Sequence, residues 1–297
     1  MSGWLPLAPC TPAACVDRTR AAAAVPRAVL RLTAVAVLLL AGIAVVLAPS
    51  GLRRRLPAVL VRRWCRWVVR AAGVRVRVTG AAVPRGGLLL VANHVSWLDI
   101  PLLAAVRPAR MLAKSEIGRW PVAGGPTARA GVLFIERDRP RALPGTVDAI
   151  ARALRAGAAV AAFPEGSTWC GRARGPFRRA VFQAALDAGV PVQPVRIRYR
   201  AGERAVSTTP AFVGVDTLLA SLWRVASARG LTAEVEVRPV VPPGRHRDRR
   251  ALARATEYAV HGDQGKAPSK SMCALRGLCR FHTAGCGQPE GRHSKGG

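Results

Sequence analysis

From residue 71 onward the chain alternates short apolar runs with amphipathic segments, and this alternation restricts the possible folds more than any other feature of the sequence. The apolar runs have the length of buried strands. They lie at Val74–Val78, Leu88–Ala92, Val132–Ile135, Ala158–Phe163 and Val190–Tyr199. Strands that alternate with helices favour an α/β domain whose largely parallel sheet is flanked by helices. In such sheets the reactive residues gather where strands end.

The segments between and after these strands carry helix signals. Residues 144–156 and 176–188 are amphipathic, and each is followed by a glycine that can end a helix. Asp216 has the position of a helix N-cap, and we expect this helix to run to Gly230, before an alternating strand at Val235–Val241. Two prolines in the Val190–Tyr199 strand predict that it is excluded from the centre of the sheet.

Near the N-terminus, residues 32–48 contain no charged side chain. At about 1.5 Å per residue this helix reaches about 26 Å, slightly less than the ~30 Å hydrocarbon core of a bilayer. A marginal membrane span, a re-entrant or interfacial hairpin and a cleaved signal peptide are all open. The signal peptide is disfavoured because Arg53, Arg54 and Arg55 follow at once, and such charge resists translocation.

The next stretch has the pattern of a basic amphipathic helix. Arg62, Arg66 and Arg70 repeat at helical spacing, and Trp64 and Trp67 fall on another face. Indole rings sit well at the level of lipid headgroups, which favours an interfacial anchor over an ordinary surface helix packed on the domain. We therefore expect an N-terminal extension over residues 1–25 and a membrane-anchoring segment over residues 26–70.

The large net charge of the chain restricts its possible functions only weakly. The chain has 46 basic and 16 acidic residues and a net charge of +30, and only four of the basic residues are lysines. Alanine and glycine are abundant too, so we interpret the arginine excess mainly as codon bias of a GC-rich genome. The charge points to an anionic partner but does not choose between nucleic acid, a membrane surface and an acidic protein.

The seven cysteines are odd in number and scattered, which excludes a small secreted disulfide scaffold and suits a reducing compartment. Cys273, Cys279, His282 and Cys286 cluster near the C-terminus. Their spacing fits none of the usual paired-cysteine zinc patterns, so we predict no metal site and no cofactor. The α/β domain is expected over residues 71–260, and residues 261–297 are expected to form a tail without stable structure.

The first strand exit carries a candidate catalytic pair. His94 directly follows the Leu88–Ala92 strand, and Asp99 lies five residues later, where a helix can begin. A histidine suits a general base, and a nearby carboxylate can fix its tautomer and stabilise the imidazolium. The attacking hydroxyl could then come from a substrate rather than from the enzyme. The alternative is a strand-end histidine beside an aspartate that caps the helix.

Three further strand exits complete a recognisable set. They read Gly-Val-Leu-Phe-Ile-Glu-Arg at residues 131–137, Phe-Pro-Glu-Gly at 163–166 and Val-Pro-Val-Gln-Pro-Val at 190–195. With Asn93-His94-Val-Ser96-Trp-Leu-Asp99, these four blocks resemble in order and spacing the signatures of the glycerolipid acyltransferases, above all the bacterial 1-acylglycerol-3-phosphate acyltransferases. The resemblance covers residues 75–200 and implies the fold of that family, with residues 71–260 as the acyltransferase domain.

The resemblance also implies a mechanism. His94, oriented by Asp99, would take the proton from the free hydroxyl of a lysophospholipid, which attacks an acyl thioester carried by coenzyme A or acyl carrier protein. Neither a covalent enzyme intermediate nor a metal is needed. Asn93 and Ser96 are expected to support the site, with Ser96 a local hydrogen-bonding residue rather than a nucleophile. The membrane-anchoring segment predicts a location at the cell membrane, and we expect the active site to face the cytoplasm.

Further residues are assigned to substrate binding on the same grounds. Arg137 is a candidate to hold the phosphate, since guanidinium pairs bidentately with phosphate oxygens. Lys114 is assigned to headgroup or carrier binding. Glu165, Gly166 and Ser167 are expected to shape the acceptor site, the glycine by allowing close backbone approach.

One departure concerns the acceptor. Where the family commonly continues Phe-Pro-Glu-Gly with Thr-Arg-Ser, this chain has Ser167-Thr168-Trp169. Arg172, Arg174 or Arg178 could replace the missing arginine, or the acceptor could be a lyso-aminolipid such as lyso-ornithine lipid. Two other classes are less compatible with the sequence: a membrane-tethered nucleic-acid binder lacks a recognisable module, and a serine hydrolase lacks its Gly-x-Ser-x-Gly elbow. We expect no nucleic-acid partner.

Overall fold

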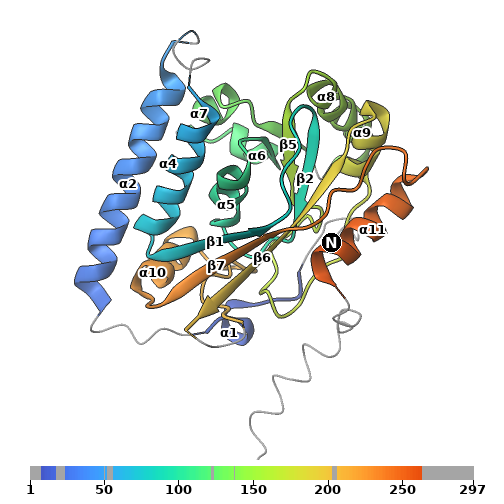
Figure 1. Cartoon of the computed structure of the whole chain (residues 1–297). Coiled ribbons are helices and arrows are strands. Elements are labelled where there is room, and N and C mark those ends of the chain that lie inside the picture. Colours follow the sequence, from blue (N-terminus) through green and yellow to red (C-terminus); the bar gives the residue numbers. More distant parts are fainter. Residues whose placement is uncertain are drawn as a thin grey trace, which may run out of the picture.

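The structure is a computed structural model that describes residues 8–17, 24–49, 51, 56–121, 124–136, 138–202 and 206–262. Its centre is a seven-stranded sheet in the order β1-β7-β6-β2-β5-β3-β4 (Figure 1). The strands are β1 (Val74–Gly80), β2 (Leu88–Ala92), β3 (Arg110–Lys114), β4 (Leu133–Ile135), β5 (Ala159–Ala162), β6 (Val192–Ala201) and β7 (Leu231–Val237). Neighbouring strands run parallel except β6 and β7, which confirms the largely parallel sheet.

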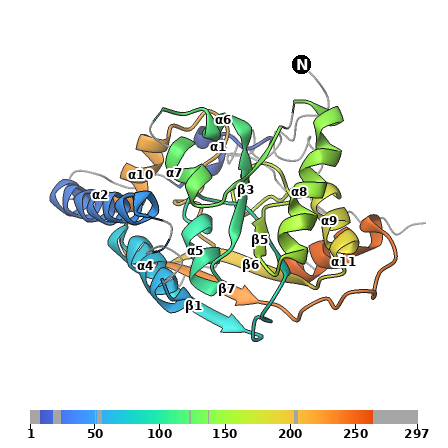
Figure 2. The ribbon, with the colours of Figure 1, turned by 90° about the horizontal axis from the view of Figure 1, so that it is seen from above.

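Helices cover both faces of this sheet (Figure 2). On one side lie α4 (Ala58–Ala71), α5 (Asp99–Val106) and α10 (Leu218–Ser227), and on the other α8 (Leu143–Arg155), α9 (Ala180–Ala188) and α11 (Arg249–His261). The remaining elements are α1 (Pro12–Cys15), α2 (Val25–Leu47), α6 (Ser115–Gly118), α7 (Gly124–Arg129) and a 3₁₀ turn (Pro140–Ala142).

Two apolar cores result, one on each face, and β2 divides its residues between them. Leu88, Leu90 and Ala92 belong to the core beneath α4, α5 and α10, while Leu89 and Val91 belong to the core beneath α8, α9 and α11. Successive side chains of a strand point to opposite faces, so a continuous apolar run fits a strand buried on both sides. This burial fixes the end of β2, and with it the residues that follow.

The predicted exclusion of β6 from the middle of the sheet was wrong, because β6 lies between β7 and β2. Pro194 pairs with Val91 in the ladder to β2, and its carbonyl accepts the Arg238 N–H at 3.0 Å on the other side. The amide and carbonyl of one strand residue face the same side, and the ladder to β7 begins only at Val195. Proline therefore removes no hydrogen bond to β2.

The predicted cap at Asp216 was also wrong. Thr217 is the N-cap of α10, and its hydroxyl accepts the Ala220 N–H at 3.2 Å. The Asp216 carboxylate instead forms an ion pair with Arg224 at 2.6 Å, and both side chains are largely buried. A charged partner about two turns into α10 thus holds the aspartate, and the neighbouring threonine caps the helix.

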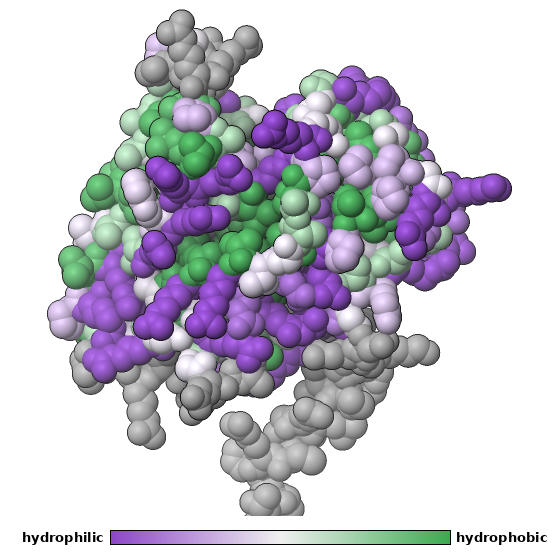
Figure 3. All heavy atoms as spheres, viewed as in Figure 1, coloured by the Kyte–Doolittle hydropathy of each residue, from purple (hydrophilic) through white to green (hydrophobic). Residues whose placement is uncertain are grey.

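The helix α2 is long and apolar enough to cross a membrane, by length and composition. One side of it packs on the domain: Trp64 of α4 donates to the Leu38 carbonyl at 3.1 Å, and Arg31 donates to the carbonyls of Ala226 and Ala228 at 2.9 and 2.6 Å. Other apolar residues of α2 are exposed, including Val29, Leu30, Val37 and Leu40. Figure 3 shows hydrophobic side chains along this edge of the molecule.

Some predictions fall on residues that the structure does not describe. Arg137, the three arginines at 53–55 and the cysteine-containing tail from residue 263 lie outside the described residues.

Candidate active site

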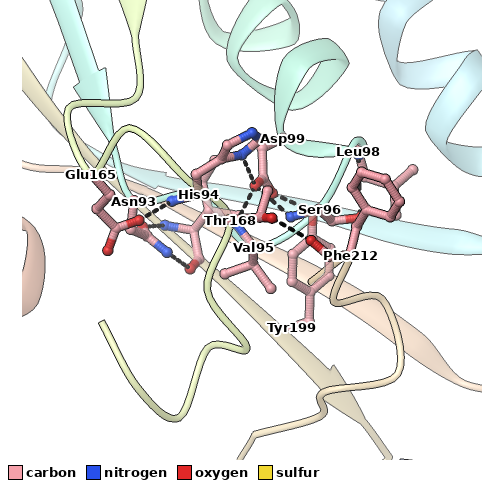
Figure 4. Close-up of polar contacts among 11 residues, drawn as sticks. Asn93, His94, Val95, Ser96, Leu98, Asp99, Glu165, Thr168, Tyr199 and Phe212 are labelled. Carbon is pink, nitrogen blue, oxygen red and sulfur yellow. Dashed lines mark hydrogen bonds and ion pairs between the residues drawn. The ribbon is translucent and has the colours of Figure 1, made fainter. Parts of the chain in front are cut away.

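The end of β2 places His94 at the edge of the sheet, partly open to solvent (Figure 4). Its side chain is 19% exposed, and its ring stacks on Phe163 at a centroid distance of 3.9 Å. Its backbone N–H donates to Glu165 at 2.7 Å, and its carbonyl accepts the Trp169 N–H at 2.7 Å. The exit of β5 therefore holds both the ring and the backbone of His94.

Asp99 orients the His94 ring. The carboxylate is fully buried, and its Oδ2 lies 2.9 Å from His94 Nδ1. An ionised carboxylate only accepts hydrogen bonds, so this contact assigns the proton to Nδ1 and leaves Nε2 as the nitrogen that can take up a proton. The same Oδ2 accepts the backbone N–H groups of Val95 at 2.6 Å and Ser96 at 2.8 Å. Asp99 is the first residue of α5, whose N-cap is Leu98, so the alternative of an aspartate that caps the helix is wrong.

Tyr199 completes the environment of Asp99. Tyr199 lies near the end of β6, and its hydroxyl donates to Asp99 Oδ1 at 2.6 Å. The Asp99 carboxylate therefore accepts four hydrogen bonds: one from the His94 ring, two from backbone N–H groups and one from this phenol. Burial, followed by the charge of Asp99 and the hydrogen bond to it, raises the pKa of Tyr199 well above its ordinary value. The phenol therefore stays a donor. Sequence reasoning missed this residue. The available signal was its rarity, because the chain has only two tyrosines and this one lies at the end of a buried strand.

Glu165 contacts the backbone of His94 and not its ring. It is 3% exposed, and it links the His94 N–H, at 2.7 Å, to the Gly175 N–H, at 3.2 Å. Burial raises the pKa of Glu165 to about 8, against the opposing effect of these two backbone hydrogen bonds. His261, at the end of α11, places its Nε2 3.7 Å from the same carboxyl group, and burial lowers the pKa of His261 to about 4.

The side chains of Asn93 and Ser96 bind backbone groups near the end of β2. The Asn93 amide donates to the Ile197 carbonyl at 2.9 Å and accepts the Ile197 N–H at 2.8 Å, which joins the end of β2 to β6. Ser96 is fully buried, and its hydroxyl accepts the Leu98 N–H at 3.3 Å. This burial leaves the Ser96 hydroxyl badly placed to attack a substrate.

Other predicted site residues lie at the same edge of the sheet. Lys114 is exposed at the end of β3, and its register partner in β4 is Ile135, two residues before Arg137. Gly166 has a φ of 73°, which suits glycine, and it continues the tight turn that begins at Phe163. Ser167 is half-buried in this turn. Because β2, β5, β3 and β4 are parallel neighbours, their carboxyl ends meet at one edge.

The structure also gathers three cysteines that the sequence presents as scattered. Cys10, Cys15 and Cys170 lie together, and Cys170 directly follows the residue whose N–H binds the His94 carbonyl. The available signal was the pair Cys10 and Cys15, five residues apart, but nothing local relates it to position 170.

A family model described as Acyltransferase matches residues 75–198. Lyso-ornithine lipid O-acyltransferase from Pseudomonas aeruginosa is 39% identical over 225 residues, which cover 71% of this chain and 83% of that protein. 1-acyl-sn-glycerol-3-phosphate acyltransferase from Neisseria gonorrhoeae is 39% identical over 176 residues, which cover 59% of this chain and 68% of that protein.

Among solved structures, the 1-acyl-sn-glycerophosphate acyltransferase from Thermotoga maritima superposes with a TM-score of 0.57 at 18% identity, covering 89% of this chain and 98% of that one. This likeness concerns the fold. Together with the identity to curated relatives over most of their length, it leads to one conclusion. The chain belongs to the glycerolipid acyltransferase family and is an O-acyltransferase.

Proposed function

We propose that the protein transfers an acyl group from an acyl thioester to the free hydroxyl of a lysolipid, with 1-acylglycerol-3-phosphate as acceptor and phosphatidic acid as product. The observation that carries this proposal is the His94–Asp99 pair. Asp99 is buried and held by four donors, and it fixes the proton on His94 Nδ1. The names of the relatives from P. aeruginosa and N. gonorrhoeae support a lysolipid acceptor.

In the proposed reaction, His94 Nε2 removes the proton of the acceptor hydroxyl as its oxygen attacks the thioester carbonyl carbon. The tetrahedral intermediate then collapses, the carbon–sulfur bond breaks, and the thiol leaves with the proton from His94. The imidazolium formed in between is stabilised by the Asp99 carboxylate at 2.9 Å. A general base of this kind contributes roughly 10²–10⁴-fold in rate, and positioning supplies much of the remainder.

Residues at the carboxyl ends of the neighbouring strands would bind the acceptor. We assign the phosphate to Arg137 and the headgroup or the thioester carrier to Lys114. Lys114 is the last residue of β3, Arg137 comes two residues after β4, and both strands end at the same edge as β2. Gly166 and Ser167 would line the acceptor site, while the contacts of Glu165 support a positioning role for that residue through the His94 and Gly175 backbones.

A second candidate acceptor, lyso-ornithine lipid, is favoured by the surroundings of Thr168. Its hydroxyl donates to the Phe212 carbonyl, so this position holds the neighbouring loop and supplies no charge to a phosphate. Arg172, one possible replacement, forms an ion pair with Asp17 at 2.9 Å. A lyso-aminolipid needs less grip on a phosphate, and the relative from P. aeruginosa carries the name of such an enzyme.

We further propose that α2 and α4 attach the enzyme to a membrane as an interfacial hairpin. Three arginine–carbonyl hydrogen bonds from Arg27 and Arg31 hold the start of α2 on the end of α10, and α2 also contacts α7. A helix fastened along the domain presents its exposed apolar side to one leaflet, with the basic side chains of α4 at the level of the headgroups. The active site would face the cytoplasm, where acyl thioesters are made.

The test is an acyl-transfer assay on detergent-solubilised protein with labelled acyl-CoA and acyl carrier protein as donors. 1-acylglycerol-3-phosphate and lyso-ornithine lipid are offered separately, and His94→Ala is the matched control. His94-dependent product with the first acceptor is the expected result. Product with lyso-ornithine lipid alone would overturn 1-acylglycerol-3-phosphate as the acceptor but keep the reaction type. The absence of His94-dependent product with every combination of donor and acceptor would overturn the proposal.

A further inference from the structure

A cluster of three cysteines lies beside the active site and has no role in the proposed reaction. The sulfur atoms of Cys10, Cys15 and Cys170 all lie within 4.8 Å of one another. Cys10 and Cys170 are buried in the core beneath α5, at 1% and 3% exposure, and Cys15 packs against that core. In the described part of the chain, the other free cysteine, Cys65, lies alone on α4.

The spacing of the three sulfurs fits a thiophilic metal ion. Zinc–sulfur bonds of about 2.3 Å in a tetrahedral site place sulfur atoms about 3.8 Å apart, so a small contraction of the cluster brings three ligands to one ion. Three thiolates select a soft or borderline cation over magnesium or calcium, and zinc does not require a change of oxidation state. The described residues give the group three protein ligands, so a tetrahedral ion would take its fourth from outside them.

Backbone amides already point at these sulfurs, as they do around bound thiolates. The N–H groups of Ala173 and Arg172 are directed at the Cys170 sulfur, and the Cys10 thiol is hydrogen-bonded to it. The Cys170 N–H is directed at the Cys10 sulfur, and the Thr11 N–H at that of Cys15. Outer hydrogen bonds of this kind orient ligands and disperse the charge that they carry.

The segment that supplies two of the ligands is held against the loops that surround the site. Asp17 accepts the Thr208 N–H at 3.1 Å and pairs with Arg172 at 2.9 Å, two residues beyond Cys170. A Cβ on Gly214 would lie 2.9 Å from the Cys10 carbonyl oxygen, so that loop approaches the segment closely. Ligands from distant parts of the chain are thus brought together independently of a metal.

We propose that Cys10, Cys15 and Cys170 bind a zinc ion that fastens residues 8–17 to the loop after β5. That loop contains Glu165 and Trp169, which hold the His94 backbone through hydrogen bonds of 2.7 Å each. The ion would replace the thiol protons of its ligands and so release them on binding. Its role would be structural, since the loop that it fastens contacts the His94 backbone through Glu165 and Trp169.

The test uses the full chain with Cys273, Cys279 and Cys286 changed to serine, so that the tail offers no thiol. Purified protein is assayed for zinc by mass spectrometry and for thiols after denaturation with chelator and without reductant. We expect about one zinc per chain and four titratable thiols. Cys10→Ser, Cys15→Ser and Cys170→Ser should each lose the zinc, whereas Cys65→Ser, the matched control, should keep it.

Cobalt substitution keeps the test decisive if a cysteine variant fails to fold. In the background with the tail serines only, Co²⁺ should give a thiolate charge-transfer band, and X-ray absorption of the zinc protein should count three sulfur ligands. Zinc that persists in all three variants, fewer sulfur ligands, or four thiols without bound metal would overturn the proposal. Two thiols without metal would also overturn it, in favour of a disulfide within the cluster.

Discussion

The buried carboxylate of Asp99 offers the sharpest perturbation of the proposed chemistry. Asp99→Asn keeps the size of the side chain and one acceptor oxygen, which can still receive the N–H groups of Val95 and Ser96. The new amide N–H₂ can donate to the Tyr199 oxygen, which lies 2.6 Å from Asp99 Oδ1. The fold should therefore survive, and the change removes mainly the negative charge 2.9 Å from His94 Nδ1.

The expected loss follows from that distance. With an effective dielectric constant of ~20, opposite unit charges 2.9 Å apart attract by about 6 kcal/mol. A charge-assisted hydrogen bond contributes at most about 3 kcal/mol, and we take this smaller value as the lower bound of the expected loss. Since ~1.4 kcal/mol corresponds to a tenfold change in rate, kcat/KM should fall by about 10²- to 10⁴-fold.

The assay follows release of free coenzyme A from acyl-CoA in the presence of the acceptor, with urea unfolding on the same preparations. Tyr199→Phe is the comparison, because it removes one donor to Asp99 and keeps the charge, and it should cost only about 5- to 30-fold. An Asp99→Asn enzyme that is folded and keeps more than about a tenth of the wild-type kcat/KM would refute the imidazolium-stabilising role.

Three further expectations concern single residues. Ser96→Ala should keep most of the transfer activity, because Ser96 is buried and bonded to the Leu98 N–H; a loss as large as that of His94→Ala would point to a serine nucleophile. Glu165→Gln should flatten the pH dependence of stability. Since the folded pKa of Glu165, about 8, lies above the ordinary value of 4.5, the native state binds more protons between these values. The wild-type free energy of unfolding should thus fall relative to the variant as pH rises from 5 to above 8, by a few kcal/mol at most, at about 1.4 kcal/mol per pKa unit; parallel urea-denaturation curves at all pH values would contradict this. Thr168→Arg should lower the KM for 1-acylglycerol-3-phosphate more than that for lyso-ornithine lipid, and an equal change for both acceptors would argue against an acceptor phosphate near position 168.

The sheet and the contact between His94 and Asp99 were predictable because both depend on local patterns. Leu88–Ala92 is apolar throughout since it is buried on both faces, and its exit fixes the place of His94. Asp99 lies only five residues after His94, so its contact with the histidine needs little knowledge of the rest of the chain. β3, at Arg110–Lys114, was not predicted, because none of its residues is buried and a basic residue stands at each end.

The support around the pair depends on packing that the local sequence does not encode. Tyr199 reaches Asp99 across 100 residues, through the pairing of β6 beside β2. Cys10 and Cys15 meet Cys170 only after the N-terminal segment has folded against the loop behind β5. The mistaken placement of β6 had a similar origin: the cost of a proline depends on which side of the strand its missing N–H would face, and that follows from the neighbouring strands.

The most direct test of the central claim compares wild-type protein with His94→Ala in the acyl-transfer assay, with equal amounts of each recovered in liposome flotation. We expect thioester-dependent acylation of 1-acylglycerol-3-phosphate by the wild type, a loss of at least about 10²-fold in the variant, and unchanged membrane binding. Acylation that persists undiminished in a folded, membrane-bound His94→Ala protein would contradict the account. His94 could then not be the base that removes the proton of the acceptor hydroxyl.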